Sequence, residues 1–264
     1  MVNSQPQTAL ITGASGGIGY EFAKLLANDR YNLVLVARNA AKLTQIADEL
    51  QRQFGVTVKS VALDLTVPTA PRTLFDSLQR ENVTVDILIN NAAYGILGEF
   101  SKVPLEESLG QVQLNITSLT ELTRLFVAPM TERKRGKVLN VASVAGFLPG
   151  PLMAVYYATK AYVISFSEAI ANELAGSGVT VTCLCPGATD TGFQGRAGID
   201  GTILFKAMRP MDAKTVARDG YRALLAGKTL AISGFSNWLL AESVRFSPRK
   251  LVTAISRKVL DKAR

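Results

Sequence analysis

Short apolar runs alternate with longer amphipathic segments over most of the chain. Runs rich in Val, Ile and Leu predict strands at 8–12, 32–37, 58–64, 85–92, 136–143, 179–187 and 229–233. Between them, apolar residues recur with helical spacing and predict helices at 17–27, 40–54, 71–81, 110–130, 155–175 and 213–227. Strands that are apolar throughout and separated by helices are typical of a parallel sheet covered on both faces. We therefore expect a doubly wound α/β fold of about seven strands, forming a single domain over residues 1–264.

The last residues, 246–264, have the pattern of a basic amphipathic helix appended to this domain. Its apolar stripe consists of Leu251, Val252, Ile255, Val259 and Leu260. Its other side carries Arg249, Lys250, Arg257 and Lys258. Two roles fit this pattern: packing against its own subunit or a partner, or a weak peripheral contact with an anionic membrane.

The net charge of +8 is concentrated in the same tail. Residues 245–264 contain seven Lys or Arg and a single Asp, so the rest of the chain is close to neutral. Elsewhere no basic patch is interleaved with aromatic residues, which argues against a nucleic-acid partner.

The chain contains no histidine, which narrows its chemistry. A Ser-His-Asp triad and a His-ligated metal centre are both excluded, and no metal site is predicted. Cys183 and Cys185 lie on one face of a predicted strand and should be buried free thiols in a reducing compartment. The first residues lack a signal-peptide pattern, and no apolar run approaches the ~18 residues of a membrane span, so we expect a cytoplasmic protein.

A glycine-rich turn, TGASGGIG at 12–19, joins the first predicted strand to the first helix. Its glycines remove side chains where the backbone turns, and the helix presents free N–H groups and the positive end of its dipole. This arrangement binds the pyrophosphate of a dinucleotide, although a tight turn without a ligand has the same glycines. The cofactor contacts expected in this turn are Gly13, Ser15, Gly16, Gly17, Ile18 and Gly19.

The end of the second strand indicates which dinucleotide binds. An NAD-selective site places a carboxylate there to accept a hydrogen bond from the ribose 2′-OH. Here Ala37 and Arg38 occupy that corner. A guanidinium suits a 2′-phosphate, so we expect NADP(H) in preference to NAD(H), the alternative being an ordinary exposed arginine.

The segment 154–170 carries one lysine, Lys160, in a largely apolar helix that also holds Tyr156 and Tyr157. At about 100° per residue, Tyr156 lies roughly 40° from Lys160 around the helix and Tyr157 roughly 60° on the other side. Geometry alone therefore favours Tyr156 only slightly as the partner of the lysine.

Six motifs follow one another over nearly the whole chain. They are the G-x-x-x-G-x-G turn at 13–19, NNA at 90–92, Asn115, Ser143, the Tyr-x-x-x-Lys of 156–160 and PGATDT at 186–191. With this set the chain resembles the short-chain dehydrogenase/reductase family, in its compact single-domain branch. The resemblance implies a Rossmann-like fold and NAD(P)-dependent oxidoreductase activity on alcohol or carbonyl groups.

The resemblance also assigns roles to individual residues. It implies a catalytic set of Asn115, Ser143, Tyr156 and Lys160, and it decides for Tyr156 because that tyrosine lies thirteen residues after the serine and four before the lysine. It places Asp64 and Leu65 at the adenine and Asn91 and Ala92 along a ribose. Pro186, Gly187 and Thr189 would lie near the nicotinamide amide.

The chemistry expected of this set is proton transfer to a carbonyl oxygen. A phenol has a reference pKa of ~10, and a neighbouring ammonium such as Lys160 should lower it. Ser143 can hold the substrate oxygen beside the phenol. Asn115 would anchor a water that links Lys160 to solvent.

Three loops after strand ends, 93–100, 144–154 and 192–208, are expected to determine the substrate. They are rich in apolar residues, and we expect Ser143, Phe147, Met153 and Phe193 to contact the substrate, although apolar loops can also simply pack on the core. A hydrophobic ketone, aldehyde or acyl-type substrate fits best. The glycine-rich third loop has the character of a lid.

The leading interpretation is NADPH-dependent reduction of a carbonyl. Alternatives are NAD(P)+-dependent oxidation of a secondary alcohol, a sugar-nucleotide epimerase or dehydratase, and a non-catalytic NADP-binding sensor or scaffold. The resemblance further implies a homodimer or homotetramer formed through helices at about 111–130 and 155–175.

Overall fold

The computed structural model describes residues 6–200, 202–203 and 210–261. Its main sheet has seven parallel strands in the order β3-β2-β1-β4-β5-β6-β9. They are β1 (Thr8–Thr12), β2 (Asn32–Ala37), β3 (Val58–Ala62), β4 (Ile87–Asn90), β5 (Gly136–Val141), β6 (Val179–Cys185) and β9 (Leu230–Ile232). The predicted single α/β domain with a seven-stranded parallel sheet is confirmed.

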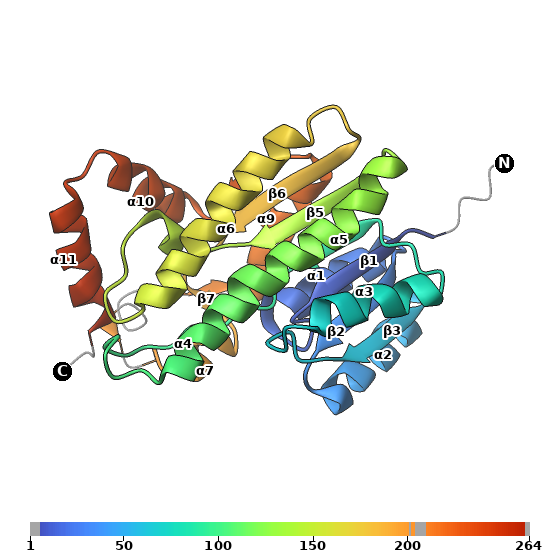
Figure 1. Cartoon of the computed structure of the whole chain (residues 1–264), viewed down its shortest axis with the longest axis horizontal. Helices are drawn as coiled ribbons and strands as arrows, with labels where there is room; N and C mark the ends of the chain where they lie inside the picture. Colours follow the sequence, from blue (N-terminus) through green and yellow to red (C-terminus); the bar gives the residue numbers. More distant parts are fainter. Residues whose placement is uncertain (1–5, 201, 204–209, 262–264) are drawn as a thin grey trace.

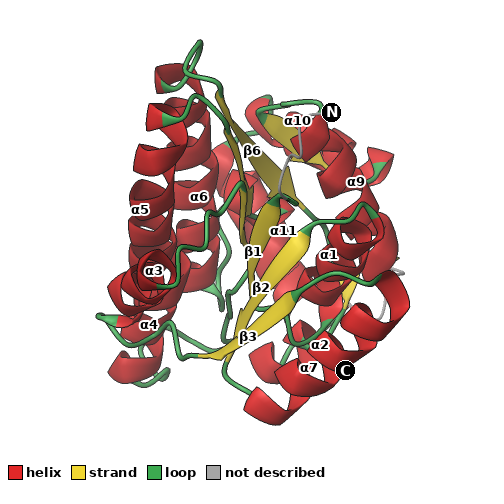
Figure 2. Cartoon of the chain, turned by 90° about the vertical axis from the view of Figure 1, so that its right-hand side faces the viewer, coloured by secondary structure: helices red, strands yellow, loops and turns green. Residues whose placement is uncertain are grey.

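Helices cover both faces of this sheet (Figures 1 and 2). One face is covered by α1 (Gly17–Asn28), α2 (Ala40–Phe54) and α9 (Ala213–Leu225). The other is covered by α3 (Ala70–Arg80), α5 (Leu119–Glu132) and α6 (Ala154–Glu173). Because both faces are buried, the strands are apolar on both sides, as in Leu10 and Ile11 of β1, which are both fully buried.

The strand order reverses direction at β1, which pairs with β2 on one side and β4 on the other. In open parallel sheets this reversal leaves a crevice at the carboxyl ends of the strands, since the connections on the two sides go to opposite faces. The loops after β1, β4, β5 and β6 therefore meet at one edge of the sheet, and the predicted motifs come together there.

The predicted helix at 110–130 is longer and less regular than expected. It starts with α4 (Leu105–Val112), passes through a π-helical segment η1 (Gln113–Ser118) and continues as α5. Asn115 lies in the π-helical segment. Single π turns inside α-helices are frequent at functional sites.

The chain after β6 contains several elements that the sequence did not predict. They are β7 (Thr189–Asp190), α7 (Phe193–Ala197), β8 (Met211–Asp212) and α10 (Phe235–Arg245). The predicted C-terminal helix is present as α11 (Arg249–Leu260). Figure 1 shows α10 and α11 at one end of the molecule, away from β3 and α2.

The structure also bears on the two cysteines and on membrane-spanning helices. Cys183 and Cys185 are buried and free, as predicted. Within the described ranges, none of the helices combines the length and apolarity needed to cross a bilayer.

Candidate active site

A cavity of about 830 Å³ lies at the carboxyl ends of the strands. It is lined by the glycine turn at one end, by Ser143, Tyr156 and Lys160 in its middle, and by apolar side chains at the other end. The predicted cofactor residues on its surface are Gly13, Ser15, Gly16, Gly17, Ile18, Arg38, Asp64, Leu65, Asn91, Ala92, Pro186, Gly187 and Thr189. Of the residues predicted for the site, only Gly19, Asn115 and Phe147 do not line it.

The glycine turn leaves no room for side chains on its inner side. Gly13 has a positive φ of 66°, and a Cβ there would lie 2.8 Å from the side-chain nitrogen of Asn91. A Cβ on Gly19 would lie 2.4 Å from the carbonyl oxygen of Gly13, so Gly19 permits the turn to pack closely rather than facing the cavity. α1 has no side-chain cap at its N-terminus, and the cap residue Gly16 lines the cavity. The turn therefore fits a pyrophosphate, which accepts hydrogen bonds from such N–H groups.

Two side chains fix this turn against the loop after β4. The Thr12 hydroxyl accepts hydrogen bonds from the backbone N–H groups of Asn91 and Ala92, each at 3.0 Å. The Asn91 side-chain amide donates to the carbonyl oxygens of Thr12 at 3.0 Å and Gly13 at 3.2 Å. Asn91 thus lines the cavity while its amide protons hold the glycine turn in place.

Charged residues gather where the adenine end of a dinucleotide would lie. Burial alone would raise the pKa of Asp64, but hydrogen bonds from Thr66 and the charges of Arg38 and Arg196 outweigh it, so this pKa lies below its ordinary value. The Arg196 guanidinium is 4.5 Å from the centroid of the Tyr94 ring. Burial, and then repulsion from Arg38, lower the pKa of Arg196. Arg38 is therefore not the only cation at this end of the cavity, and nothing in the sequence distinguished Arg196 from a surface arginine.

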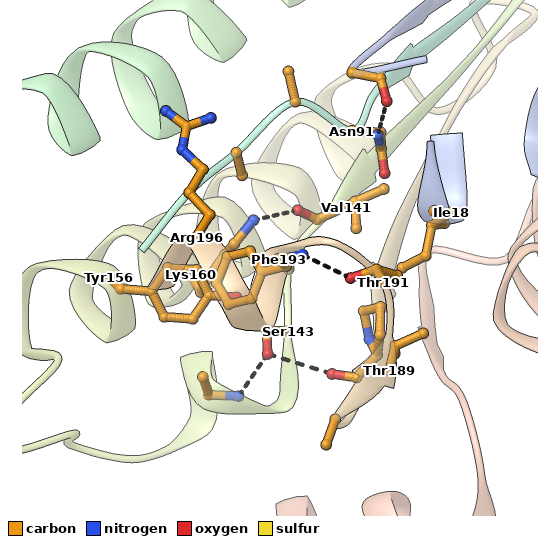
Figure 3. A pocket seen from close by; sticks show the side chains of 18 of the residues that line it. Ile18, Asn91, Val141, Ser143, Tyr156, Lys160, Thr189, Thr191, Phe193 and Arg196 are labelled. Carbon is orange, nitrogen blue, oxygen red and sulfur yellow. Dashed lines mark hydrogen bonds between the residues drawn. The ribbon is translucent and has the colours of Figure 1, made fainter. Parts of the chain in front are cut away.

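The catalytic candidates Ser143, Tyr156 and Lys160 lie together in the middle of the cavity (Figure 3). The Lys160 ammonium donates a hydrogen bond to the Val141 carbonyl oxygen at 2.8 Å and lies 5.7 Å from the centroid of the Tyr156 ring. The Ser143 hydroxyl donates to the Pro186 carbonyl oxygen at 3.3 Å. α6 therefore brings the tyrosine and the lysine to the ends of β5 and β6.

Burial determines how the tyrosine and the lysine of this site titrate. It raises the pKa of Tyr156 well above the ordinary value, with a hydrogen bond to Ser143 acting in the opposite direction. It lowers the pKa of Lys160 to about 8. Burial is thus the largest influence on the pKa of Tyr156, and the expected lowering of this pKa by Lys160 stays a prediction.

Asn115 lies beside the site but does not line the cavity. Its side-chain amide donates to the Tyr94 carbonyl oxygen at 2.9 Å and to the Thr159 hydroxyl at 3.1 Å. Its side-chain oxygen accepts from the Tyr94 N–H at 3.2 Å. Asn115 is therefore a positioning residue that connects the loop after β4 to α6, next to Lys160, and a water relay through it stays a prediction.

The far end of the cavity is apolar. Met153 and Phe193 line it as expected, and the Phe193 ring lies 5.2 Å from the Tyr156 ring, centroid to centroid. Phe147 was expected to contact the substrate, but it does not line the cavity. At the end of the short helix η2 (Val144–Phe147), it packs against the buried cluster that contains Val163, Cys183 and Cys185. The expected lid, 192–208, contains α7, and its residues 201 and 204–208 lie outside the described part of the chain.

The two C-terminal helices form a wall of this apolar end that the sequence did not assign to the site. Leu240 of α10 and Ile255, Val259 and Leu260 of α11 line the cavity. Leu260 is almost fully buried and belongs to the cluster that contains Met153. The predicted stripe of α11 is only partly buried, since Val252 and Leu260 pack inward while Leu251 and Ile255 are exposed. Gly234 and Pro248, which bracket an apolar run, were the available signal for α10.

No group of acidic, cysteine or histidine side chains in the described ranges could hold a metal ion.

A family model described as short chain dehydrogenase matches residues 7–200. The chain belongs to this family. The fold class expected from the sequence and its resemblance to short-chain dehydrogenases are both confirmed.

Two curated proteins are similar to part of this chain. A very-long-chain 3-oxoacyl-CoA reductase of Pyrenophora tritici-repentis is 38% identical over 182 residues, covering 67% of this chain and 53% of the relative. A 17-beta-hydroxysteroid dehydrogenase type 3 of Mus musculus is 35% identical over 196 residues, covering 72% of this chain and 62% of the relative. The chain thus spans little more than half the length of these curated relatives.

A solved structure resembles the whole fold more completely. The short-chain dehydrogenase from Sphingobium yanoikuyae in complex with NADPH superimposes with a TM-score of 0.82 at 33% identity. The superposition covers 91% of this chain and 94% of that chain.

Proposed function

We propose that the protein reduces the carbonyl group of a hydrophobic ketone, aldehyde or acyl-type substrate to an alcohol, using NADPH. The observation that carries this proposal is that three kinds of groups line one cavity. They are the glycine turn, the side chains of Ser143, Tyr156 and Lys160, and apolar side chains that pack with Tyr156.

The residues at the first end fit NADPH. The free N–H groups at the start of α1 would hold the pyrophosphate, and Arg38 and Arg196 would hold the 2′-phosphate, since no carboxylate follows β2. Asp64 and Leu65 would flank the adenine, and Pro186, Gly187 and Thr189 the nicotinamide amide. When bound, NADPH would supply a hydride to the carbonyl carbon.

The proton for the carbonyl oxygen would come from the Tyr156 hydroxyl. Burial raises its pKa, which keeps the phenol protonated but also makes it a weaker acid, so proton donation requires a group that stabilises the phenolate. The Lys160 ammonium, held by the Val141 carbonyl, would stabilise the negative charge that develops on the phenol. Ser143 would hold the carbonyl oxygen beside Tyr156.

The substrate class is inferred from the apolar wall. Met153, Phe193, Leu240 and Leu260 would contact an aliphatic or alicyclic chain. The names of two relatives, a very-long-chain 3-oxoacyl-CoA reductase and a 17-beta-hydroxysteroid dehydrogenase, support a hydrophobic carbonyl compound. A sugar or a small charged metabolite would leave this wall in contact with water.

The proposal is tested with a series of methyl ketones and aldehydes of increasing chain length. Oxidation of NADPH and of NADH is followed by absorbance in separate assays. We expect kcat/KM to rise with chain length and to be higher with NADPH. A preference for NADH would refute the cofactor assignment, and no dependence on chain length would refute the substrate class.

We also propose an assembly of two or four copies through α4, α5 and α6. The support is a row of exposed apolar side chains on α4, which includes Leu105 and Leu109. Light scattering on the purified protein would measure the number of copies, and a monomer would contradict this proposal.

A cytoplasmic location is the last part of the proposal. Its support is the pair of buried free thiols of Cys183 and Cys185, whose sulfur atoms lie 3.9 Å apart. Imaging of the tagged protein in its native cell would test it, and a signal confined to an oxidising compartment would contradict it.

A further inference from the structure

The outer face of α10 is apolar and has no covering element among the described residues. Phe235, Trp238 and Phe246 are 77%, 46% and 87% exposed. Together with Leu239 they follow helical spacing, so they lie on one face, and the rings of Phe235 and Trp238 stack at 5.7 Å. The opposite face of α10 packs inward through Asn237 and Ala241, which are buried.

α11 carries two further exposed apolar side chains, one of which lines the cavity. Leu251 and Ile255 lie one turn apart and are each 54% exposed. Ile255 and the half-exposed Leu240 also line the cavity, so the cavity reaches the protein surface between the two helices. We call the six residues Phe235, Trp238, Leu239, Phe246, Leu251 and Ile255 the C-terminal apolar surface. A surface of this kind marks an interaction site rather than an ordinary exposed helix.

The charges around the C-terminal apolar surface are mostly positive. α10, α11 and the turn between them carry Arg245, Arg249, Lys250, Arg257 and Lys258. Arg245 pairs with Glu242 at 3.2 Å and Arg257 with Asp261 at 3.5 Å. In the described ranges, the other three cations form no ion pair with a carboxylate.

We propose that the C-terminal apolar surface docks onto an anionic lipid membrane. Aromatic side chains beside Lys and Arg are the composition of helices that lie in the membrane interface, where rings enter the headgroup region and cations contact lipid phosphates. A second copy of the chain fits less well. A two-fold contact through this surface would bring the cations of one copy against those of the other, and like charges across an interface oppose association.

The cavity mouth borders the docked surface, because Ile255 belongs to both and Leu240, which lines the cavity, directly follows Leu239 of that surface. A lipophilic molecule dissolved in the bilayer would then enter the cavity without crossing water. Docking itself is independent of the proposed carbonyl reduction, so the two can fail separately.

Trp238 allows a direct test, because it is the only tryptophan of the chain. The full-length protein is mixed with vesicles of phosphatidylcholine alone or of phosphatidylcholine with phosphatidylglycerol. We expect co-sedimentation with the anionic vesicles, weakened by high salt, together with a shift of tryptophan emission to shorter wavelength and quenching by brominated acyl chains. Sedimentation without a change in emission would mean that another surface binds, and would overturn the proposal.

Variants separate the apolar and the charged contributions. Trp238→Ala with Phe246→Ala, and Arg249→Glu with Lys250→Glu, should each lower the bound fraction at least several-fold while turnover of a short, water-soluble ketone stays unchanged. The matched controls, Phe100→Ala and the charge reversal Arg72→Glu with Arg80→Glu, should bind vesicles like the wild type. Equal losses in test and control variants would overturn the proposal. So would an emission shift that depends on protein concentration in the absence of lipid, which would indicate a second copy on this surface.

Discussion

The two ends of the cavity are built in different ways. At the phosphate end the main chain sets the geometry, and a Cβ on Gly19 would lie 2.4 Å from the backbone oxygen of Gly13. At the apolar end, side chains from α10 and α11 form the wall, and several of them are partly exposed. At the phosphate end, a substitution of a closely packed glycine would displace the main chain. At the apolar end, one hydrophobic side chain can replace another without displacing a strand.

This difference explains how far the family similarity extends along the chain. The family match ends at residue 200, before α9, α10 and α11 begin. A backbone-built phosphate site requires particular residues at fixed positions, and these give a recognisable motif. A wall of apolar side chains requires only hydrophobic residues of suitable size, which many sequences provide.

The largest effect should come from the middle of the cavity, where both ends meet. Tyr156→Phe removes the proton donor and should lower kcat by about 10²–10⁴-fold while leaving NADPH binding nearly unchanged. Turnover and NADPH titration by fluorescence measure the two quantities. Tyr157→Phe is the matched control and should keep turnover near the wild-type rate. If Tyr157→Phe were the inactive variant, the proton donor would be the other tyrosine.

At the phosphate end, Arg38→Asp should weaken NADPH binding by about 10- to 100-fold, because a charge-assisted contact is replaced by a like charge. NADH binding should change much less. Isothermal titration with both cofactors measures the difference, with Arg52→Asp on the exposed side of α2 as the control. Equal losses for the two cofactors would show that Arg38 does not contact the 2′-phosphate.

Also at the phosphate end, Gly19→Ala should lower the free energy of unfolding by about 1–3 kcal/mol, since the added methyl group forces the turn apart. Chemical denaturation of the protein without cofactor measures this. Gly16→Ala is the control, because a Cβ there meets no atom within 4 Å. A Gly19 variant as stable as the Gly16 variant would show that the turn is not closely packed.

At the apolar end, Leu240→Ala should lower kcat/KM for a long-chain ketone by roughly three- to tenfold and leave NADPH binding unchanged. The reason is the loss of apolar contact with the substrate chain. Leu225→Ala, a similarly exposed leucine at the end of α9, is the control. A loss of NADPH affinity in Leu240→Ala would contradict the separation of the two ends.

The smallest effect concerns Lys160, whose pKa in the folded protein is about 8. Because this lies below the unfolded value of ~10.4, the unfolded chain binds more protons between the two values, and this lysine's contribution to stability rises with pH in that window. The wild type should gain about 1 kcal/mol relative to Lys160→Met between about pH 7 and pH 9. Denaturation across this range measures the difference, and the exposed Lys214→Met should follow the wild type. A difference that does not change with pH would contradict the burial of a charged lysine.

The sequence predicted those parts of the molecule whose structure or position follows from a short residue pattern. The seven strands form as expected, and the glycine turn, Arg38, Ser143, Tyr156 and Lys160 line the cavity. The strands follow from apolar periodicity and the turn from its glycines, whereas Ser143 and the choice of Tyr156 came from the resemblance to a known family.

The rest depended on tertiary packing that no local pattern records. Arg196 reaches the phosphate end only because α7 packs over Tyr94. Phe147 was expected in the cavity, but it packs against the buried cluster that contains Cys183 and Cys185. Burial also raises the pKa of Tyr156, and the degree of burial is not visible in the sequence.

The π-helical segment η1 interrupts a helix that the sequence predicts as regular. In an ideal α-helix, Asn115 would fall in line with Leu119 and Leu122, four and seven residues later, and would face the same core as they do. The wider π turn offsets the amide by roughly one residue, or about 100° of rotation, from that line. The helix can therefore keep its leucines buried in the hydrophobic layer. At the same time the Asn115 side chain points in a different direction and forms hydrogen bonds with Tyr94 and Thr159.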